Sequence, residues 1–199
     1  MKPIIGIILR DDKSANGNDI KYAYTDIISA IIKSNGIPIG IDCKNIDKYL
    51  DICQGFILQG GDDIDELDLK AIEIIKNNDL PLLGICLGMQ EMAYYDEGII
   101  YDINLHKHDN LHEIIINKDS LLYKILGCVR TLVNSRHSSA VKSTNLSVSA
   151  VSEDNVIEAI EDKDKRFFLG VQWHPENMYD GDLNSRKIFD YFIKICNDK

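Results

Sequence analysis

The sequence predicts an α/β fold in a single domain, built on a central, mostly parallel β-sheet with helices on both faces. In the first half, apolar segments of strand length alternate with helical stretches, a pattern typical of a parallel sheet covered on both sides. In the second half, short strand-like segments follow one another closely, which predicts antiparallel additions to the sheet. The chain has 199 residues and neither an internal repeat nor a linker-like stretch, so residues 1–199 are expected to form one domain.

The first half supplies the parallel part of the predicted sheet. Strands are expected near residues 3–9, 37–41, 55–58 and 81–85, and helices near 20–35 and 64–77. The last of these strands leads directly to a cysteine. The carboxyl end of a central parallel strand is where an open α/β sheet normally binds its ligand, so this position is a candidate site.

The second half supplies the antiparallel part and a final helix. Short strands are expected near residues 113–117, 131–134, 146–152, 156–160 and 167–173, with one short helix near 120–126. The final helix, roughly 183–196, is amphipathic, since its apolar residues share one face. Those residues are Ile188, Phe189, Phe192, Ile193 and Cys196.

Composition limits the partners of the protein. The net charge of −10 argues against a surface that coats nucleic acid, which needs a clustered basic face, but it leaves room for a small phosphorylated ligand. The apolar runs are too short to span a bilayer, and the run Ile4–Leu9 precedes charged residues without a cleavage-like site. We expect a cytoplasmic protein with a small-molecule substrate, no nucleic-acid or membrane partner and no cofactor, and we leave a homodimer open.

The cysteines and most histidines do not predict a metal site. The five cysteines are odd in number, scattered and never spaced as CxxC, so neither a disulfide framework nor a zinc site is indicated. His106, Lys107, His108 and His112 lie among Asn, Asp and Lys residues, without a carboxylate spacing that would complete a site. We interpret this segment as a solvated loop. A small cationic rim for an anionic leaving group is the alternative.

The most informative segment is Gly84-Ile85-Cys86-Leu87-Gly88-Met89-Gln90. A cysteine with glycines at i−2 and i+2, between a buried strand and a helix, is the nucleophile-elbow pattern with sulfur in place of oxygen. The sharp turn crowds the backbone, so the neighbours of the cysteine must lack side chains. The turn also places the sulfur at a helix N-terminus, which favours the thiolate. We expect Cys86 to be a nucleophile; a buried structural thiol is the alternative.

A second segment, Gly170-Val171-Gln172-Trp173-His174-Pro175-Glu176, supplies a base. Pro175 biases His174 away from helical angles, so the segment is extended there. Residues i and i+2 of an extended chain point to the same side, which lets Glu176 contact His174 and fix its tautomer. We expect His174 to take the thiol proton and Glu176 to orient the ring. The alternative is that Glu176 is a dispensable surface acid.

These segments resemble class I glutamine amidotransferases, and more narrowly the C26 family of γ-glutamyl hydrolases. Four blocks carry the resemblance, and they are Gln59–Ile64, Gly84–Gln90, Glu158–Glu161 and Gly170–Glu176. A weaker block, Asn134–Ser139, falls where the family places a histidine-bearing substrate loop. The resemblance runs over nearly the whole chain. It implies a class I glutaminase-like (flavodoxin-like) fold and hydrolysis by a cysteine nucleophile.

Attack on an amide carbonyl builds an oxyanion, which needs two backbone N–H donors about 3 Å away. One donor should be the N–H of Leu87, because this residue follows the nucleophile. The other, as the resemblance implies, comes from Gly60 or Gly61, which follow a predicted strand beside the elbow. A simple turn is the alternative for the two glycines.

The resemblance also implies which residues bind the substrate. Gln90 lies one helical turn beyond Cys86 and corresponds to a family position that helps to hold the glutamyl group. From a facing loop, Arg136, His137 and Ser138 would do the same, and Arg136 would pair with a carboxylate or a phosphate. An ordinary polar loop is the alternative for these three residues.

The chain departs from the family where the rest of the substrate would bind. Members of the family carry an excursion after Gly-Gly-x-Asp, whereas here Asp62-Asp63 passes almost at once to a helical stretch. Leu87 stands where the family has an arginine, and Ser139 replaces the glutamine of the substrate loop. We therefore carry over the reaction type rather than the substrate.

The sequence thus predicts a cysteine hydrolase that cleaves a γ-glutamyl amide bond through a thioester on Cys86. The leaving amine is left open between γ-aminobutyrate, another small amine and a nucleotide phosphoramidate, the last as in the γ-glutamyl-CDP-amidate hydrolases of capsule biosynthesis. One alternative is a glutaminase subunit that delivers ammonia to a partner synthase. A second is a noncatalytic homologue that acts as a binding module.

Overall fold

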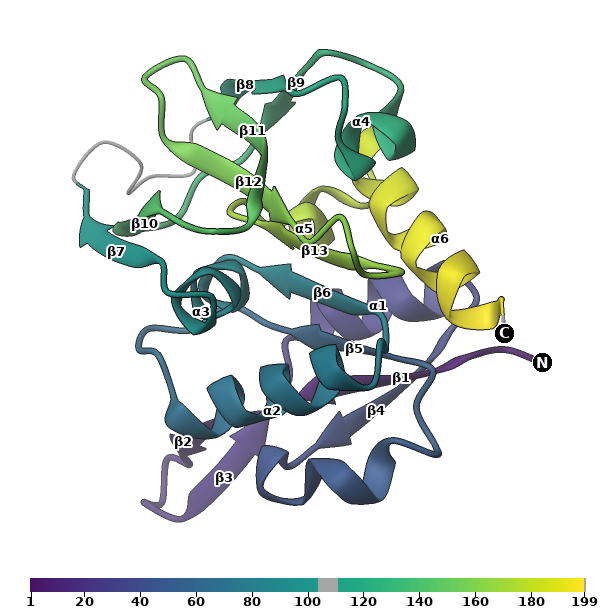
Figure 1. The fold of residues 1–199 in the computed structure, drawn as a ribbon. Coiled ribbons are helices and arrows are strands. Elements are labelled where there is room, and N and C mark those ends of the chain that lie inside the picture. Colours follow the sequence, from purple (N-terminus) through teal and green to yellow (C-terminus); the bar gives the residue numbers. More distant parts are fainter. Residues whose placement is uncertain (104–110, 199) are drawn as a thin grey trace.

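One large sheet organises the structure. The computed structural model describes residues 1–103 and 111–198. Within them the sheet runs in the order β4-β1-β5-β6-β13-β12-β11-β8-β9, and β10 pairs with both β12 and β7. Figure 1 shows β4, β1, β5 and β6 below and the antiparallel strands above, with helices packed on both sides. The predicted α/β fold is confirmed in this arrangement.

The parallel part of the sheet contains the crevice where a ligand is expected. Its strands are β4 (Ile37–Ile41), β1 (Ile4–Ile8), β5 (Gly55–Leu58), β6 (Leu82–Ile85) and β13 (Phe168–Val171). Because β1 lies between β4 and β5, the chain leaves β1 toward one side and later returns on the other. The carboxyl ends of the strands open a crevice at such a switch point.

Strand β13 joins the two halves of the molecule. It pairs in parallel with β6, with Val171 opposite Ile85, and antiparallel with β12. The N–H of Cys86 extends this pairing by donating to the carbonyl of Val171 at 2.8 Å. The segments that follow β6 and β13 therefore leave the sheet side by side, although about 86 residues separate them in the sequence.

The antiparallel part is confirmed and is larger than the sequence pattern indicates. Its strands are β12 (Ile157–Glu161), β11 (Ser147–Ser152), β8 (His112–Ile116), β9 (Arg130–Val133), β10 (Ser139–Ser143) and β7 (Ile99–Asp102). The pattern does not predict β7 and β10. Both are short, they pair mainly with each other, and their register contains an irregularity between Val141 and Ser143, so neither has a clear apolar alternation.

Two apolar layers hold the helices against the sheet. The helices are α1 (Thr25–Lys33), η1 (Cys43–Tyr49, a 3-10 helix), α2 (Glu66–Asn77), α3 (Leu87–Tyr95), α4 (Leu121–Leu126), α5 (Pro175–Met178) and α6 (Leu183–Asn197). One layer packs α1, α4 and α6 on one face, and the other packs η1, α2 and α3 on the opposite face. Alternate residues of β5 serve the two layers, Ile57 the first and Phe56 the second, as period-two side chains require. The predicted apolar face of α6 is buried in the first layer.

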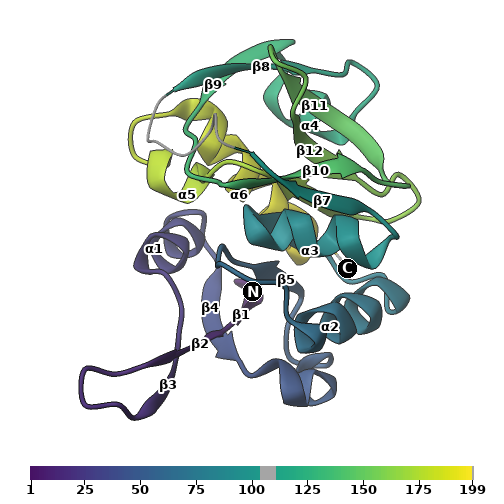
Figure 2. The same ribbon diagram turned by 90° about the vertical axis from the view of Figure 1, so that its left-hand side faces the viewer.

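The predicted helix over 20–35 begins later, at Thr25. Residues Asp19–Tyr22 form strand β3, which pairs with β2 (Arg10–Lys13) in a hairpin that projects from the domain in Figure 2. A buried side chain sets this boundary: the amide of Gln59 donates to the carbonyl of Tyr22 at 3.0 Å and accepts from the N–H of Tyr24 at 2.9 Å. Tertiary contact therefore overrides the local helical pattern.

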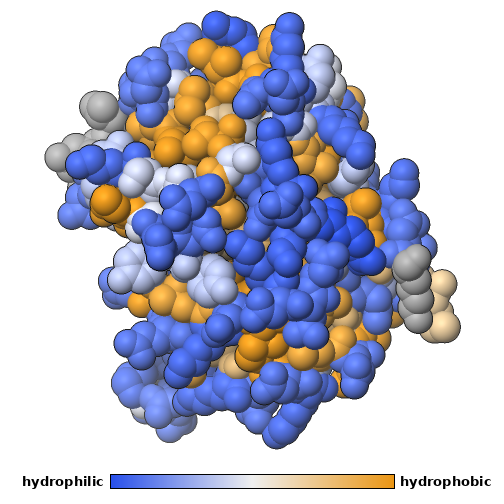
Figure 3. All heavy atoms as spheres, in the orientation of Figure 1, coloured by the Kyte–Doolittle hydropathy of each residue, from blue (hydrophilic) through white to orange (hydrophobic). Residues whose placement is uncertain are grey.

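Figure 3 shows a mostly hydrophilic face on which hydrophobic atoms appear in separate groups. No helix among residues 1–103 and 111–198 is long and apolar enough to cross a membrane. Over the same residues, no group of three or more His, Cys, Asp or Glu side chains could hold a metal ion. Of the predicted solvated loop, His106, Lys107 and His108 lie outside the described residues. For His112 the prediction is wrong, because this residue begins β8 and its Nε2 lies 3.2 Å from Oε1 of the buried Glu158.

Candidate active site

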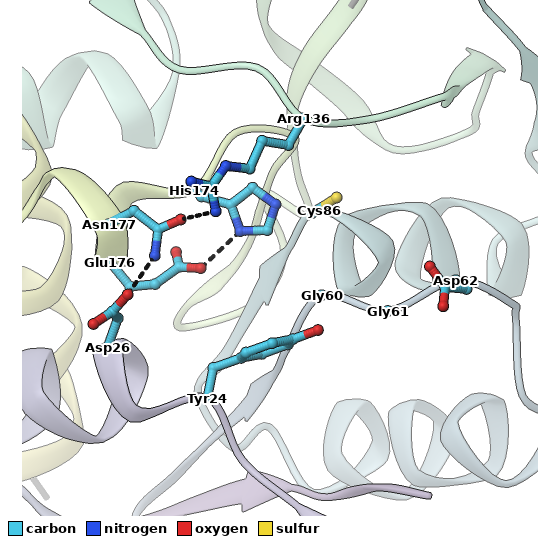
Figure 4. Close-up of a pocket in the computed structure, with 10 residues that line it drawn as sticks. All are labelled: Tyr24, Asp26, Gly60, Gly61, Asp62, Cys86, Arg136, His174, Glu176 and Asn177. Atoms are coloured by element: carbon cyan, nitrogen blue, oxygen red, sulfur yellow. Dashed lines mark hydrogen bonds and ion pairs between the residues drawn. The ribbon is translucent and has the colours of Figure 1, made fainter. Parts of the chain in front are cut away.

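Cys86 and His174 meet because β6 and β13 are neighbours. Cys86 follows the last residue of β6, and His174 lies three residues beyond the end of β13. Gly60 stands against both, since a Cβ atom built on it would lie 3.1 Å from Cε1 of His174 and 3.8 Å from Cβ of Cys86. Figure 4 shows the three residues around one cavity, with the imidazole of His174 next to the sulfur of Cys86. The structure thus brings together the two chief residues that the sequence predicts.

The backbone at Cys86 has the strained geometry expected of an elbow. Its φ and ψ are 54° and −106°, which side-chain-bearing residues rarely adopt, and it caps the N-terminus of α3. The flanking glycines allow close packing around it. A Cβ atom on Gly84 would lie 2.8 Å from the carbonyl carbon of Gly88, and one on Gly88 would collide with the carbonyl oxygen of Leu58. A larger residue at Gly84 would push α3 away from β6, and one at Gly88 would push it away from β5.

His174 is held through both its ring and its backbone. Its Nδ1 lies 2.7 Å from Oε1 of Glu176, which is buried at the first turn of α5. The predicted extended chain is wrong at Glu176, because Pro175 starts a helix there, and the first helical turn makes the contact instead. Asn134 accepts a hydrogen bond from the N–H of His174 at 2.8 Å and donates one to its carbonyl at 3.1 Å. Sequence reasoning gave no role to Asn134, although it lies in the weaker block of similarity. This two-way clamp fixes the direction in which the ring points.

Electrostatics favour the protonated form of His174. Burial alone lowers the pKa of the imidazole, but hydrogen bonds to Cys86 and Glu176 and the charge of Glu176 outweigh it, so the pKa rises to about 10. An imidazolium next to a sulfur atom is the setting in which a thiolate is stabilised. Gln172 adds a neutral donor, since its amide nitrogen lies 3.7 Å from Sγ of Cys86.

The glycine pair after β5 forms one wall of the cavity. A Cβ atom on Gly61 would lie 2.8 Å from Cδ2 of Leu87, so this loop packs directly against the start of α3. In the described part of the chain, the backbone N–H groups of Gly60, Gly61 and Leu87 donate no hydrogen bond to other residues. These groups are therefore available to a ligand, at the place where the sequence predicts an oxyanion hole.

Of the four predicted substrate-binding residues, Arg136 lines the cavity, and its guanidinium donates to Oδ1 of Asn177 at 3.0 Å. The other three lie elsewhere. Gln90 donates to the carbonyl of Ser139 at 2.8 Å and to Gln172 at 3.1 Å. His137 is buried, with Nδ1 3.0 Å from the carbonyl of Ser139. Ser138 is exposed and accepts a backbone hydrogen bond from Ile103.

The cavity, of about 280 Å³, also contains residues that sequence reasoning missed. Its full lining is Tyr24, Asp26, Gly60, Gly61, Asp62, Cys86, Arg136, His174, Glu176 and Asn177. Asp26 accepts from Nδ2 of Asn177 at 2.7 Å, so Arg136, Asn177 and Asp26 form a hydrogen-bonded chain along the rim in Figure 4. Asp62 belongs to the block Gln59–Ile64, so its place directly after the two glycines could have marked it as a cavity residue. Nothing local marks Asp26, because its partner lies 151 residues away.

A thiol beside an imidazole that is itself held by a carboxylate can attack a carbonyl carbon and transfer the acyl group. Free N–H groups next to the thiol suit the oxygen of such a carbonyl. The walls combine the carboxylates of Asp26 and Asp62 with the guanidinium of Arg136, so the cavity suits a small polar substrate that carries charges of both signs.

Known proteins resemble the chain over its whole length. The profile of the peptidase C26 family matches residues 64–176. Protein NtpR of Enterococcus hirae is 31% identical, over 98% of this chain and 99% of its own length. The gamma-glutamyl-gamma-aminobutyrate hydrolase PuuD of Escherichia coli K12 is 27% identical over 98% of this chain and 93% of its own. Among solved structures, the glutaminase domain of Trypanosoma brucei CTPS with bound acivicin superposes with a TM-score of 0.75 at 18% identity, covering 99% of this chain and 94% of that one. The last likeness concerns the fold.

Proposed function

The chain belongs to the peptidase C26 family, and from that premise we propose that it hydrolyses the γ-glutamyl amide bond of a small conjugate, releasing glutamate and an amine. The observation that carries the proposal is the assembly of Cys86, His174 and Glu176 at one cavity, with Nδ1 of His174 2.7 Å from Glu176. A sulfur nucleophile, a base and an acid that orients the base are the parts that such a reaction needs.

The reaction begins with attack of Sγ of Cys86 on the γ-carbonyl carbon. A C–S bond forms, the π electrons of the carbonyl move to its oxygen, and His174, which is protonated, holds the proton that the sulfur has given up. The N–H of Leu87 and that of Gly60 or Gly61 hold the negative oxygen. When the carbonyl re-forms, the C–N bond breaks, and the amine leaves with the proton from His174. A thioester to glutamate remains on Cys86.

Water then completes the cycle. His174 takes a proton from the water, whose oxygen attacks the thioester carbonyl through a second oxyanion. As that oxyanion collapses, the C–S bond breaks with its electrons on the sulfur, glutamate leaves, and His174 keeps the proton taken from the water, as before the first attack. The pKa of His174, raised to about 10, supports its role as the base, because an imidazole with a raised pKa takes a proton from the sulfur or from water more readily.

We infer that side chains at the rim of the cavity bind the amine portion of the substrate and so determine which amine is released. Arg136 suits a carboxylate or phosphate, whereas Asp26 and Asp62 suit an ammonium group. The likeness to a hydrolase of γ-glutamyl-γ-aminobutyrate supports γ-aminobutyrate as one leaving amine. Other small amines and a nucleotide phosphoramidate remain candidates, since the cavity opens toward these charged side chains.

Glutamate release by the purified chain tests the proposal. The panel contains γ-glutamyl-γ-aminobutyrate, other γ-glutamyl amines, a γ-glutamyl phosphoramidate nucleotide and glutamine, each with a Cys86→Ala control. Rapid turnover of one conjugate, dependent on Cys86 and faster than that of glutamine, is expected. No turnover of any conjugate, with slow release from glutamine, would instead favour the glutaminase subunit that supplies ammonia to a synthase.

A further inference from the structure

We propose that Arg10 positions the oxyanion hole, by holding the glycine loop after β5 and helix α3 in one fixed relation. Arg10 does not line the cavity and touches no reacting atom, so it is a positioning residue. The inference rests on the proposed function, because an oxyanion forms only if the protein attacks a carbonyl. It adds a residue from the start of the chain, about 76 positions before the nucleophile, to the machinery of the site.

The guanidinium of Arg10 is buried, and its donors are spread over two walls of the site. On the loop side, it donates to the carbonyl of Gln59 at 2.6 Å and to that of Gly60 at 3.2 Å. On the helix side, it makes a two-pronged contact with Glu91, at 3.1 and 3.0 Å. It also pairs with Asp68 of α2. Five N–H groups in a rigid plane thus bind two backbone carbonyls and two carboxylates.

The two loop contacts determine where the N–H groups of the glycines point. In a trans peptide, the C=O and the following N–H point in opposite directions, and the described residues contain no cis peptide bond. Since the carbonyls of Gln59 and Gly60 face Arg10, the N–H groups of Gly60 and Gly61 face the other way. Gly60 and Gly61 line the cavity, whereas Arg10 lies behind them, so the direction away from Arg10 is that of the cavity.

The helix contacts fix the second donor. Glu91 belongs to α3, the helix whose first residue is Leu87, and its side chain is fully buried. A carboxylate held by two hydrogen bonds to one guanidinium has a defined orientation, and the helix that carries it is held as well. The donor of Leu87 and the donors of the glycine loop therefore share one anchor, and their separation is set by Arg10.

The ionisation of the cluster is consistent with a single anchoring cation. Burial raises the pKa of Glu91, against the opposing charge and hydrogen bonds of Arg10. Burial raises the pKa of Asp68 as well, again against Arg10. One guanidinium thus stabilises the anionic forms of two carboxyl groups, which burial alone would destabilise. Losing the guanidinium would leave both without their cation, at a cost to folding that the test has to separate from the effect on the oxyanion hole.

The Arg10→Lys variant provides the test, because lysine retains the charge but has neither the planar fork nor five donors. In the full chain, we expect kcat for γ-glutamyl amide hydrolysis to fall by about 10- to 100-fold, less than the 10²–10³ for a deleted oxyanion donor, with KM within about threefold. Alkylation of Cys86 by iodoacetamide displaces iodide from a saturated carbon and forms no oxyanion. The rate of alkylation should stay within about twofold of the wild type. A fall in kcat without a fall in the alkylation rate is a result that a merely structural role would not give.

Two further variants keep the test sharp. Lys76→Met is the matched control, because Lys76 also bridges two carboxylates, those of Asp96 and Asp162, but does so away from the cavity; it should lower the melting temperature and leave kcat unchanged. Glu91→Gln alters the helix side alone and should also lower kcat without lowering the rate of alkylation, so the test does not depend on Arg10→Lys folding well.

A kcat within twofold of the wild type, or hydrolysis and alkylation falling together, would overturn the positioning role. A wild type that cleaves no γ-glutamyl amide would refute the proposed function as well, and is recognised without any variant.

Discussion

The floor and the rim of the cavity are built differently. The floor, with Cys86, His174 and the glycine loop, rests on buried contacts: Glu176, Asn134 and Arg10 each fix a group that faces the ligand. The rim, with Arg136, Asn177 and Asp26, consists of exposed side chains joined by two hydrogen bonds. A rigid floor suits chemistry that needs fixed distances between atoms. Exposed polar residues at a rim can be substituted with little loss of stability. Under the proposed function, the floor would therefore set the reaction and the rim the choice of leaving group.

Removing the nucleophile gives the largest effect that the comparison predicts. Cys86→Ala should lower glutamate release by at least about 10⁴-fold, because no other group in the cavity can form the thioester. The melting temperature should change little, since a methyl group still fills the turn. Assays with a conjugate at saturating concentration, with the melting curve of the same preparation, check both parts. Substantial residual turnover in a preparation free of wild type would mean that Cys86 is not the nucleophile.

A test of the packing under the floor comes next. Gly88→Ala places a Cβ atom against the carbonyl of Leu58 and should lower the free energy of unfolding by about 2–4 kcal/mol. Gly181→Ala is the matched control, because a Cβ atom there meets nothing within 4 Å, and it should be neutral or slightly stabilising. Urea unfolding of both variants decides the matter. Equal stabilities would contradict the close approach of α3 to β5.

Glu176→Gln should have a smaller effect on rate and a distinct effect on pH dependence. We expect kcat to fall by about 10- to 100-fold, since the imidazole remains but its orientation and charge lose support. The pKa of His174 should also fall from its value of about 10, which the His Cε1 proton signal would report in an NMR titration.

The sign of the stability change follows from the same pKa. A histidine whose pKa is higher in the folded state stabilises the protein fully below pH 6.5, and this stabilisation is lost as the pH rises from 6.5 through about 10. The Glu176→Gln variant should therefore be less stable than the wild type at pH 6, and the stabilities of the two proteins should converge near pH 10. An unchanged difference across that range would exclude the coupling between Glu176 and His174.

Changes at the rim should be the mildest. Arg136→Gln removes a cation but can still bind Asn177, so we expect kcat within about threefold and KM raised by about three- to tenfold for conjugates whose amine carries an acidic group. For conjugates with a cationic amine, KM should be unchanged or lower. Measuring KM for one substrate of each kind sharpens the comparison. A fall in kcat equal for both substrates would place Arg136 with the floor.

Sequence reasoning predicted the floor far better than the rim. Cys86, His174 and Glu176 were recognisable because glycines and a proline around them limit the backbone, and such limits are local. Asp26 and Asn177 left no comparable sign, because their contact joins α1 to α5 across 151 residues. Gln90 lies on the expected helix, yet Ser139 and Gln172 occupy its amide, a competition that a single helix cannot reveal.

The fold shows the same division. The parallel strands and the helices that cover them were predictable from apolar runs, and α6 has the predicted face. The hairpin of β2 and β3 was not, because a buried amide at Gln59 sets the start of α1 from outside the segment. Strands β7 and β10 acquire their structure mainly from pairing with each other.

The place of β13 in the sheet has a consequence for how the protein is made. As the ribosome releases the chain, β6 and Cys86 emerge long before Phe168–Val171, and the edge of β6 that β13 later covers stays open. The cysteine of a nascent chain therefore has no histidine beside it until β13 inserts between β6 and β12. A chain broken off before residue 168 would lack His174 and would carry an uncovered strand edge, the kind of surface on which aggregation starts.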